Sequence, residues 1–213
     1  MKRALLVVRP FGSHAIGDLI SDCFYDGTLQ SAPRRSPAWL SEALPAAVSW
    51  LTTSKLPGRF ESRSGTQITN NLEARAVRLL LGRINRAAGR ARRKLTVVAL
   101  SGYAGQRDAI RRELAPYESS WRNLSIEVAT VDTFQGREAD IAIYSVTRSN
   151  PQGSIGFLAE SRRLNVALSR GRDALVILGD HLAARTKSRE NPFDRVIEHI
   201  EDREDCVMVG VKV

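Results

Sequence analysis

The sequence lacks the features that would tie the chain to a membrane or to a disulfide framework. It contains no long apolar run, which excludes a transmembrane helix. The basic and then apolar start, residues 1–9, is too short for a signal peptide, and no small-residue cleavage site follows it. The two cysteines, Cys23 and Cys206, lie far apart and show no metal-ligand spacing. We therefore expect a cytoplasmic protein with reduced thiols and no membrane contact.

Several catalytic motifs are missing as well. No G-x-x-x-x-G-K-[ST] segment occurs, so no loop of this chain can wrap a triphosphate. No apolar strand ends in the paired acidic residues that hold magnesium. Neither a G-x-S-x-G elbow nor an H-E-x-x-H pair is present, and the three histidines are scattered. The sequence predicts no metal site and no complete catalytic machinery in this chain alone.

What is present is positive charge, and it is unevenly spread. The net charge is +9. Residues 1–95 carry 16 Lys and Arg against 6 Asp and Glu, whereas residues 96–213 carry 16 against 17. A basic half favours a polyanionic partner, nucleic acid first. An Arg-rich solvated surface gives the same composition, so both interpretations stay open.

Short apolar runs alternate with helical patterns, which predicts an α/β fold with a parallel sheet flanked by helices. Residues 1–213 are expected to form one domain, in which residues 54–71 form a long loop. In such folds ligands bind beyond the carboxyl ends of the strands. The predicted strands are Ala47–Leu51, Leu95–Leu100, Leu124–Thr130, Ile141–Thr147 and Ala174–Leu178, with a final strand near the C-terminus. The predicted helices are Ile16–Tyr25, Leu72–Ala88, Gln106–Leu114, Phe157–Ser169 and Pro192–Ile200.

The helix predicted over Leu72–Ala88 has two distinct faces. At 100° per residue, one face is apolar and consists of Ala76, Val77, Leu80, Leu81, Ile84 and Ala88. The other carries Arg75, Arg78, Arg83 and Arg86, and the chain continues with Arg90, Arg92, Arg93 and Lys94. A solvated outer face and a nucleic-acid contact both fit this pattern, the first more commonly.

Two polar segments stand out between the predicted strands. Thr130–Asp140 contains Gly136, which would let the backbone approach a ligand closely. Arg162–Arg172 lies on a predicted helix and at its end. Arg163 and Arg170 are two turns apart, roughly 10 Å along the helix axis, on one side. Two arginines at the ligand edge of a sheet suit an anionic ligand, although an ordinary ion-paired helix is as compatible with the pattern.

These segments resemble a known family. TVDTFQGREADIAIYSVTRSN (Thr130–Asn150) and RRLNVALSRGRDALVILGD (Arg162–Asp180) are similar to motifs V and VI of superfamily 1 helicases, in the 5′-to-3′ group that includes the nonsense-mediated-decay helicase and senataxin. The resemblance continues in Leu95–Leu114, Ser64–Val77 and His14–Leu29, and so covers about residues 13–180. It implies a RecA-like C-terminal helicase domain that lacks the phosphate loop.

The resemblance also implies a division of labour over the nucleotide. ATP and Mg²⁺ would be held by a separate N-terminal RecA-like domain, and none would be bound by this chain alone. Arg170 corresponds to the arginine finger, which meets charge developing on the γ-phosphate. Gln135, Gly136 and Glu138 would lie beside the nucleotide. Arg163 is assigned there as well, with a structural ion pair as an equal alternative.

By the same resemblance, a second set of residues would bind single-stranded DNA or RNA. These residues are Ser101, Tyr103, Gln106, Thr130 and Thr133. Small hydroxyls and backbone groups there would hold phosphates without reading the base sequence. Tyr103 could stack on a base or simply pack against its neighbours.

One departure from the family concerns the start of the chain. The family has Tyr-Arg-Met-His-Pro before Ala-Ile-Gly, and its arginine contacts the γ-phosphate. Here Phe11 takes the place of that arginine, and Arg9 lies two residues early. Either residues 1–12 are an aberrant or disordered start, or the nucleotide site is degenerate.

Three functions follow from these observations. The first is the C-terminal half of an ATP-dependent helicase, a hydrolase that is inactive without its first RecA-like domain. The alternative is a non-catalytic nucleic-acid-binding or adaptor module derived from a helicase. The third is an α/β domain with no nucleic-acid role, which two coinciding long motifs make the least favoured.

Overall fold

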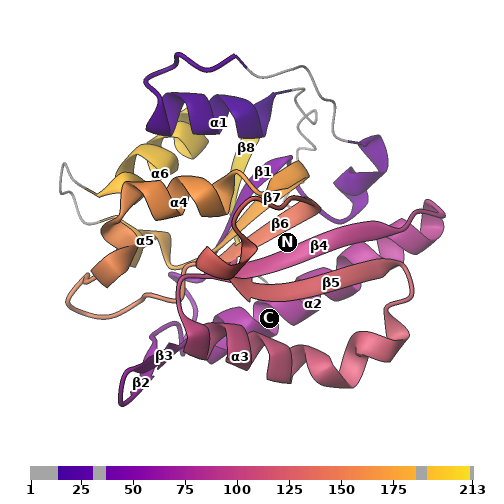
Figure 1. The fold of residues 1–213 in the computed structure, drawn as a ribbon, viewed down its shortest axis with the longest axis horizontal. Helices are drawn as coiled ribbons and strands as arrows, with labels where there is room; N and C mark the ends of the chain where they lie inside the picture. Colours follow the sequence, from indigo (N-terminus) through magenta and orange to yellow (C-terminus); the bar gives the residue numbers. More distant parts are fainter. Residues whose placement is uncertain (1–13, 31–36, 186–190, 212–213) are drawn as a thin grey trace, which may run out of the picture.

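The computed structural model describes residues 14–30, 37–185 and 191–211, and these residues are built around a six-stranded sheet (Figure 1). The strand order is β5-β4-β6-β7-β1-β8, and every neighbouring pair is parallel. Phe11 and Arg9, on which the departure from the family rests, lie outside the described residues. The strands are β1 (Val48–Thr52), β4 (Leu95–Ser101), β5 (Leu124–Thr130), β6 (Ala139–Ser145), β7 (Gly171–Gly179) and β8 (Cys206–Gly210).

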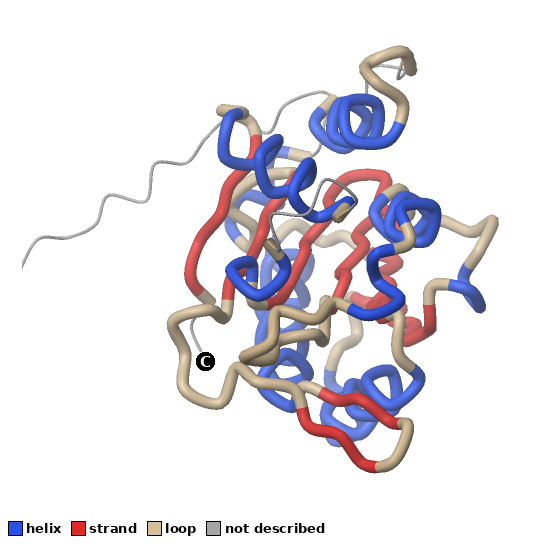
Figure 2. Tube along the Cα trace, turned by 90° about the vertical axis from the view of Figure 1, so that its left-hand side faces the viewer, coloured by secondary structure: helices blue, strands red, loops and turns tan. Residues whose placement is uncertain are grey.

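Helices cover both faces of this sheet, as Figure 1 and the turned view in Figure 2 show. One layer consists of α1 (Ala15–Phe24), α4 (Ser161–Leu168) and α6 (Pro192–Asp202), with the short α5 (His181–Ala184) beside it. The other consists of α2 (Asn71–Arg90) and α3 (Ala104–Leu114). Short 3₁₀ turns are η1 (Ala38–Glu42), η2 (Ala115–Ser120), η3 (Asp132–Phe134) and η4 (Gly156–Ala159).

The core consists of two apolar clusters, one on each face of the sheet. Along β4, for example, Val98 and Leu100 pack into the cluster under α1, α4 and α6, while Val97 and Ala99 pack into the cluster under α2 and α3. A strand that is buried on both faces has few polar side chains, and this is why the central strands β6 and β7 contain long apolar runs. The architecture is the α/β RecA-like fold that the sequence predicts.

The predicted strands and helices are present, with ends shifted by up to three residues. Two segments differ in detail. The helix predicted over Phe157–Ser169 is divided into η4 and α4, because the backbone of Glu160 between them is extended and caps a new helix. The long loop predicted over residues 54–71 includes an antiparallel hairpin of β2 (Ser62–Ser64) and β3 (Gln67–Thr69), at the lower left of Figure 1. Three-residue strands are too short to show an alternating pattern.

Helix α2 confirms the predicted division into two faces. All six apolar residues of its predicted inner face are buried. Three of the four predicted outer arginines are exposed, and Arg78 is half-buried. The helix begins where the Asn70 side chain accepts a hydrogen bond from the Glu73 backbone N–H, at 3.1 Å. The helix starts near the carboxyl ends of the strands and runs back to the start of β4. A crossover between parallel strands must return the chain to the end of the sheet where the strands begin.

Gly105 lets the first turn of α3 lie directly against the hairpin. A Cβ added at Gly105 would lie 2.9 Å from the Ile68 carbonyl oxygen, which is backbone and cannot move aside alone. We expect Gly105→Ala to lower the free energy of unfolding by about 1–3 kcal/mol, measured by urea denaturation. The control is Gly82→Ala on α2, where the added carbon meets only the Arg86 side chain, at 3.7 Å. That change should be neutral or stabilise by about 0.5–1 kcal/mol; equal losses for both variants would contradict the packing explanation.

Candidate functional site

The carboxyl edge of the sheet, where the strands end, is organised around a fully buried carboxyl group. Glu73 reaches from the first turn of α2 to the end of β6. Its Oε2 accepts hydrogen bonds from Ser145 Oγ at 2.6 Å and from the Thr147 backbone N–H at 2.8 Å. Its Oε1 has no partner among the described residues. Burial, the largest cause, raises the pKa of Glu73 to about 8, and the nearby carboxylates of Asp180 and Glu61 act in the same direction.

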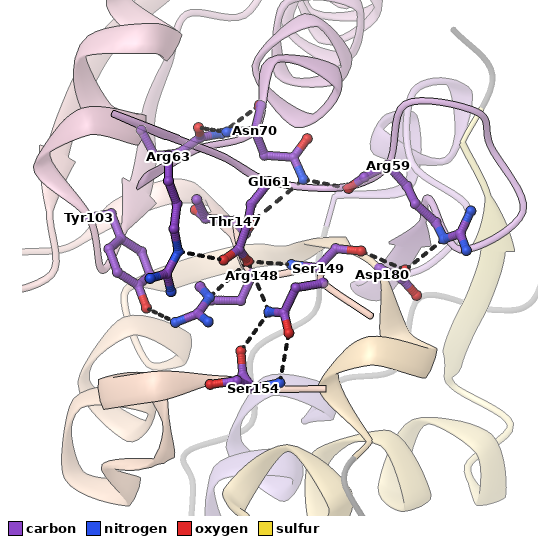
Figure 3. Close-up of polar contacts among 12 residues, drawn as sticks. Arg59, Glu61, Arg63, Asn70, Tyr103, Thr147, Arg148, Ser149, Ser154 and Asp180 are labelled. Atoms are coloured by element: carbon purple, nitrogen blue, oxygen red, sulfur yellow. Dashed lines mark hydrogen bonds and ion pairs between the residues drawn. The ribbon is translucent and has the colours of Figure 1, made fainter. Parts of the chain in front are cut away.

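A second buried acid, Glu61, holds the loop that follows β6 (Figure 3). Its Oε2 accepts hydrogen bonds from Arg148 Nε at 2.8 Å, from the Ser149 backbone N–H at 3.0 Å and from Asn150 Nδ2 at 3.1 Å. Both side chains of the Arg148–Glu61 pair are about 95% buried. Because each group would be costly to leave alone in the interior, this pair ties the segment before the hairpin to the loop after β6.

Three of the residues predicted to bind single-stranded nucleic acid lie inside this buried hydrogen-bond network. Ser101 and Gln106 are fully buried, and Tyr103 is 7% exposed. Ser101 Oγ pairs with Thr147 Oγ1 at 2.9 Å, and Tyr103 accepts a hydrogen bond from Arg148 Nη1 at 3.1 Å.

Gln106 is engaged on both of its amide atoms. Its Oε1 accepts from the Asn70 backbone N–H at 2.6 Å, while its Nε2 donates to the Asn70 carbonyl at 3.1 Å and to Ser145 Oγ at 3.0 Å. Polar side chains that are buried and hydrogen-bonded in this way hold the backbone segments of the carboxyl edge in place. A contact between single-stranded nucleic acid and the side chains of Ser101, Tyr103 and Gln106 stays a prediction.

The other two residues predicted to contact single-stranded nucleic acid lie nearer the surface, at the end of β5. Thr133 is exposed and Thr130 is half-buried. The Thr133 hydroxyl lies 3.1 Å from the Thr130 hydroxyl and donates to the Thr130 carbonyl at 3.0 Å. The Thr130 backbone N–H in turn donates to Thr133 Oγ1 at 3.1 Å. The two hydroxyls therefore form one small polar surface at the carboxyl edge.

Arg163 lies close to the same edge, where it forms an ion pair. Its guanidinium makes a two-point contact with Asp132, with Nη2–Oδ2 and Nε–Oδ1 distances of 2.7 and 3.2 Å. Glu160 lies 3.5 Å away as well. The crevice that Arg163 lines has a volume of about 10 Å³ in this chain. The structure contains the ion pair, and a position of Arg163 beside a nucleotide stays a prediction.

Arg170 lies at the opposite edge, which corrects the expectation that both arginines line the carboxyl edge. Helix α4 runs back across the sheet, so its end reaches the edge where the strands begin. The Arg170 carbonyl accepts from the Ala139 backbone N–H at 3.0 Å, at the start of β6. The two arginines are therefore at opposite ends of the helix, facing different surroundings.

The contacts of the Arg170 guanidinium are all with uncharged oxygens. It donates to the Val166 carbonyl at 2.7 Å, to the Arg137 carbonyl at 3.0 Å and to Ser169 Oγ at 2.7 Å. Within residues 14–30, 37–185 and 191–211, no carboxylate forms an ion pair with it. The side chain is half-buried and fixed in direction, and its positive charge is not neutralised.

The remaining residues predicted beside a nucleotide lie near Arg170. Gln135, Gly136 and Glu138 are exposed on the segment that leads from the end of β5 to the start of β6. Gly136 has φ +77°, in the left-handed region that favours glycine, and an added Cβ would meet nothing within 4 Å. The Arg137 carbonyl joins this segment to the Arg170 guanidinium.

Sequence reasoning missed the acids and the arginine that organise the carboxyl edge. Glu61, Glu73, Asp180 and Arg148 are each at least 95% buried by side chain or by whole residue. One available signal was the spacing of Asn70 and Glu73, which is typical of a helix N-terminus. That spacing does not reveal that the Glu73 side chain turns inward to β6. Among the described residues there is no cluster of three metal-ligating side chains, and no helix is long and apolar enough to cross a membrane.

Known proteins similar to this chain include several helicases. The family described as an AAA domain matches residues 12–182. The chain is 31% identical over 206 residues to the ATP-dependent helicase NAM7 of Saccharomyces cerevisiae, which covers 92% of this chain and 20% of that protein. It is 35% identical over 202 residues to a Regulator of nonsense transcripts 1 homolog of Arabidopsis thaliana, covering 92% and 16%. The chain therefore spans about a fifth of the length of these relatives.

Proposed function

This chain belongs to the superfamily 1 helicases of the AAA-domain family, and from that membership we propose that it acts as the second RecA-like domain of such an enzyme. In this role it binds single-stranded nucleic acid and supplies an arginine finger to ATP. The nucleotide and its Mg²⁺ are held by a separate first domain, because this sequence contains no phosphate loop.

The observation that carries the proposal is the environment of Arg170. Three neutral oxygens fix the direction of its guanidinium, and no described carboxylate cancels its charge. An arginine prepared in this way can stabilise the charge that develops on a γ-phosphate without reorganising first. Gln135, Gly136 and Glu138 border the same region and are proposed as nucleotide neighbours. Arg163 is not included among the proposed nucleotide neighbours, because its guanidinium forms an ion pair with Asp132.

The single-stranded nucleic acid is proposed to lie at the carboxyl edge of the sheet, over the exposed hydroxyls of Thr130 and Thr133. Hydroxyls and backbone N–H groups contact phosphates without discriminating between bases, so either DNA or RNA suits this surface. Residues 131–138 run from this edge to the region of Arg170. They therefore give a direct covalent connection between the proposed strand site and the proposed nucleotide site.

The proposal is tested by adding a first RecA-like domain with a phosphate loop to this chain. We expect no ATP hydrolysis from the chain alone, and hydrolysis stimulated by single strands when both domains are present. Strand binding, followed by fluorescence anisotropy, should weaken as salt rises and should respond to ATP only in the pair. ATP hydrolysis by the isolated chain would overturn the proposal. Strand binding that never responds to nucleotide would favour a non-catalytic adaptor instead.

A further inference from the structure

The outer surface of α2 carries a continuous run of cations on the face of the sheet opposite α4. We define the basic stripe as Arg75, Arg83, Arg86, Arg92, Arg93 and Lys94, all of which are exposed. None of these six cations pairs with a carboxylate of the described residues. The only acid in residues 71–94 is Glu73, which points inward and is fully buried. The six residues of the stripe therefore carry charge of one sign, and the two other arginines of the helix, Arg78 and Arg90, are paired with Glu113 and Glu42.

The stripe is long and it begins near the proposed strand site. An α-helix of 20 residues is about 30 Å long, close to the length of nine base pairs of duplex. Its first turn lies at the carboxyl edge, where Asn70 Nδ2 donates to the Thr147 carbonyl at 3.3 Å. Its continuation, residues 91–94, reaches the opposite end of the sheet, where β4 begins.

An open hollow between α2 and α3 widens the stripe at this end. It has a volume of about 410 Å³, with Ala74 and Ala109 among its lining residues. Arg75 and Arg112 line it without ion-pair partners among the described residues, whereas the third charged group, Glu113, is neutralised by Arg78 at 2.7 Å. Two guanidinium groups that form no ion pair among the described residues, above small side chains, suit a phosphate group.

The composition of this surface distinguishes between possible anionic partners. A membrane-binding helix keeps its apolar face for the lipid, whereas the apolar face of α2 is buried in the core. A protein interface needs an apolar or aromatic centre, whereas on the outer face of α2 the apolar residues Leu72 and Leu79 are only partly exposed and the arginines are the exposed groups. The exposed aromatic residue nearby, Tyr117, is stacked on Trp121, and Arg78 lies over its ring. Tyr117 therefore presents no free ring face to an unpaired base, and the exposed cations fit a phosphate backbone best.

We propose that the basic stripe binds the phosphate backbone of double-stranded nucleic acid, as a second contact outside the proposed strand site. Contacts between these cations and phosphates carry no sequence information, so duplex DNA and duplex RNA are both expected to bind. The stripe lies on the opposite face of the sheet from α4, away from Arg170, and so goes beyond the proposed function. A blunt duplex, which offers no single strand, therefore tests the stripe separately from the proposed function.

The test compares two triple variants that lose the same charge. The stripe variant carries Arg75→Gln, Arg83→Gln and Arg86→Gln. The control variant carries Arg185→Gln, Arg195→Gln and Arg203→Gln, on or next to α5 and α6 at the other face. Each is titrated with labelled blunt duplex DNA and duplex RNA of about two helical turns, and with a single strand of equal length, between about 50 and 200 mM salt. Circular dichroism and thermal melting check that both are folded.

We expect the stripe variant to bind either duplex at least about 10-fold more weakly at low salt. The slope of log K against log salt should fall by up to about 0.9 for each lost contact. The control should stay within about 3-fold, and a triple Arg→Lys variant of the stripe should retain binding because it keeps the charge. Equal losses in the stripe and control variants, or no duplex binding by the original chain, would overturn the proposal. Binding of poly-glutamate in place of either duplex would assign the stripe to an acidic protein and overturn it as well.

Discussion

Arg170→Ala is expected to lower kcat for ATP hydrolysis by about 10³-fold or more in an enzyme that contains both RecA-like domains. The guanidinium is already aimed by its bonds to the Val166 and Arg137 carbonyls and to Ser169 Oγ. Alanine removes the charge that would meet the γ-phosphate, and nothing nearby among the described residues replaces it. The measurement is steady-state ATP hydrolysis stimulated by single-stranded nucleic acid, with strand affinity determined on the same samples.

Arg170→Lys should recover little of this loss. The guanidinium is a planar fork that donates to three acceptors while its charge faces outward, and a lysine ammonium cannot reproduce that geometry. The matched control is Arg172→Ala, two residues along the chain, because Arg172 is also partly exposed but pairs with Asp140 at 2.5 Å. The control should keep kcat within a few-fold. An Arg170→Ala enzyme with an unchanged rate would remove Arg170 from the reaction, and loss of strand binding in the same variant would point to misfolding.

The sheet and its helices could be predicted because their signals are local. The parts of β4 and β7 that are buried on both faces, residues 97–100 and 174–178, appear in the sequence as uninterrupted apolar runs. Helix α2 shows its buried face through a regular spacing, and every residue of that face proved to be buried. The hairpin of β2 and β3 carries no such signal, since each strand has three residues and most of them are exposed. Its position depends on contact with α3 at Gly105.

The placement of the site residues could be predicted only in part, because it depends on which edge of the sheet each residue reaches. Arg163 and Arg170 share one side of a helical pattern, yet the helix spans the sheet and separates them. Ser101 and Gln106 follow a strand end, as a ligand contact would, but the Glu73 carboxyl and the Asn70 backbone draw the polar groups around them into the interior. No pattern within one segment reveals a partner about 30 residues or more away.

The buried Glu73 carboxyl gives the carboxyl edge a measurable dependence on pH. The unfolded chain has a glutamate pKa of about 4.3, whereas burial raises the pKa of Glu73 to about 8 in the folded protein. The folded state therefore binds this proton more tightly than the unfolded state does. The associated stability is fully present below the unfolded pKa and is lost progressively as pH rises through the folded pKa.

Glu73→Gln is expected to abolish this dependence, because its amide oxygen can still accept from Ser145 and Thr147 and carries no charge. Relative to the variant, the original chain should lose about 1 kcal/mol in free energy of unfolding for each pH unit between about 5 and 8. Urea denaturation across that range measures both curves, and their difference cancels the groups that both proteins share. Glu113→Gln, at a half-exposed position on α3, should follow the original chain. Parallel curves for Glu73→Gln and the original chain would mean that Glu73 stays ionised in the interior, held by contacts stronger than its two hydrogen bonds.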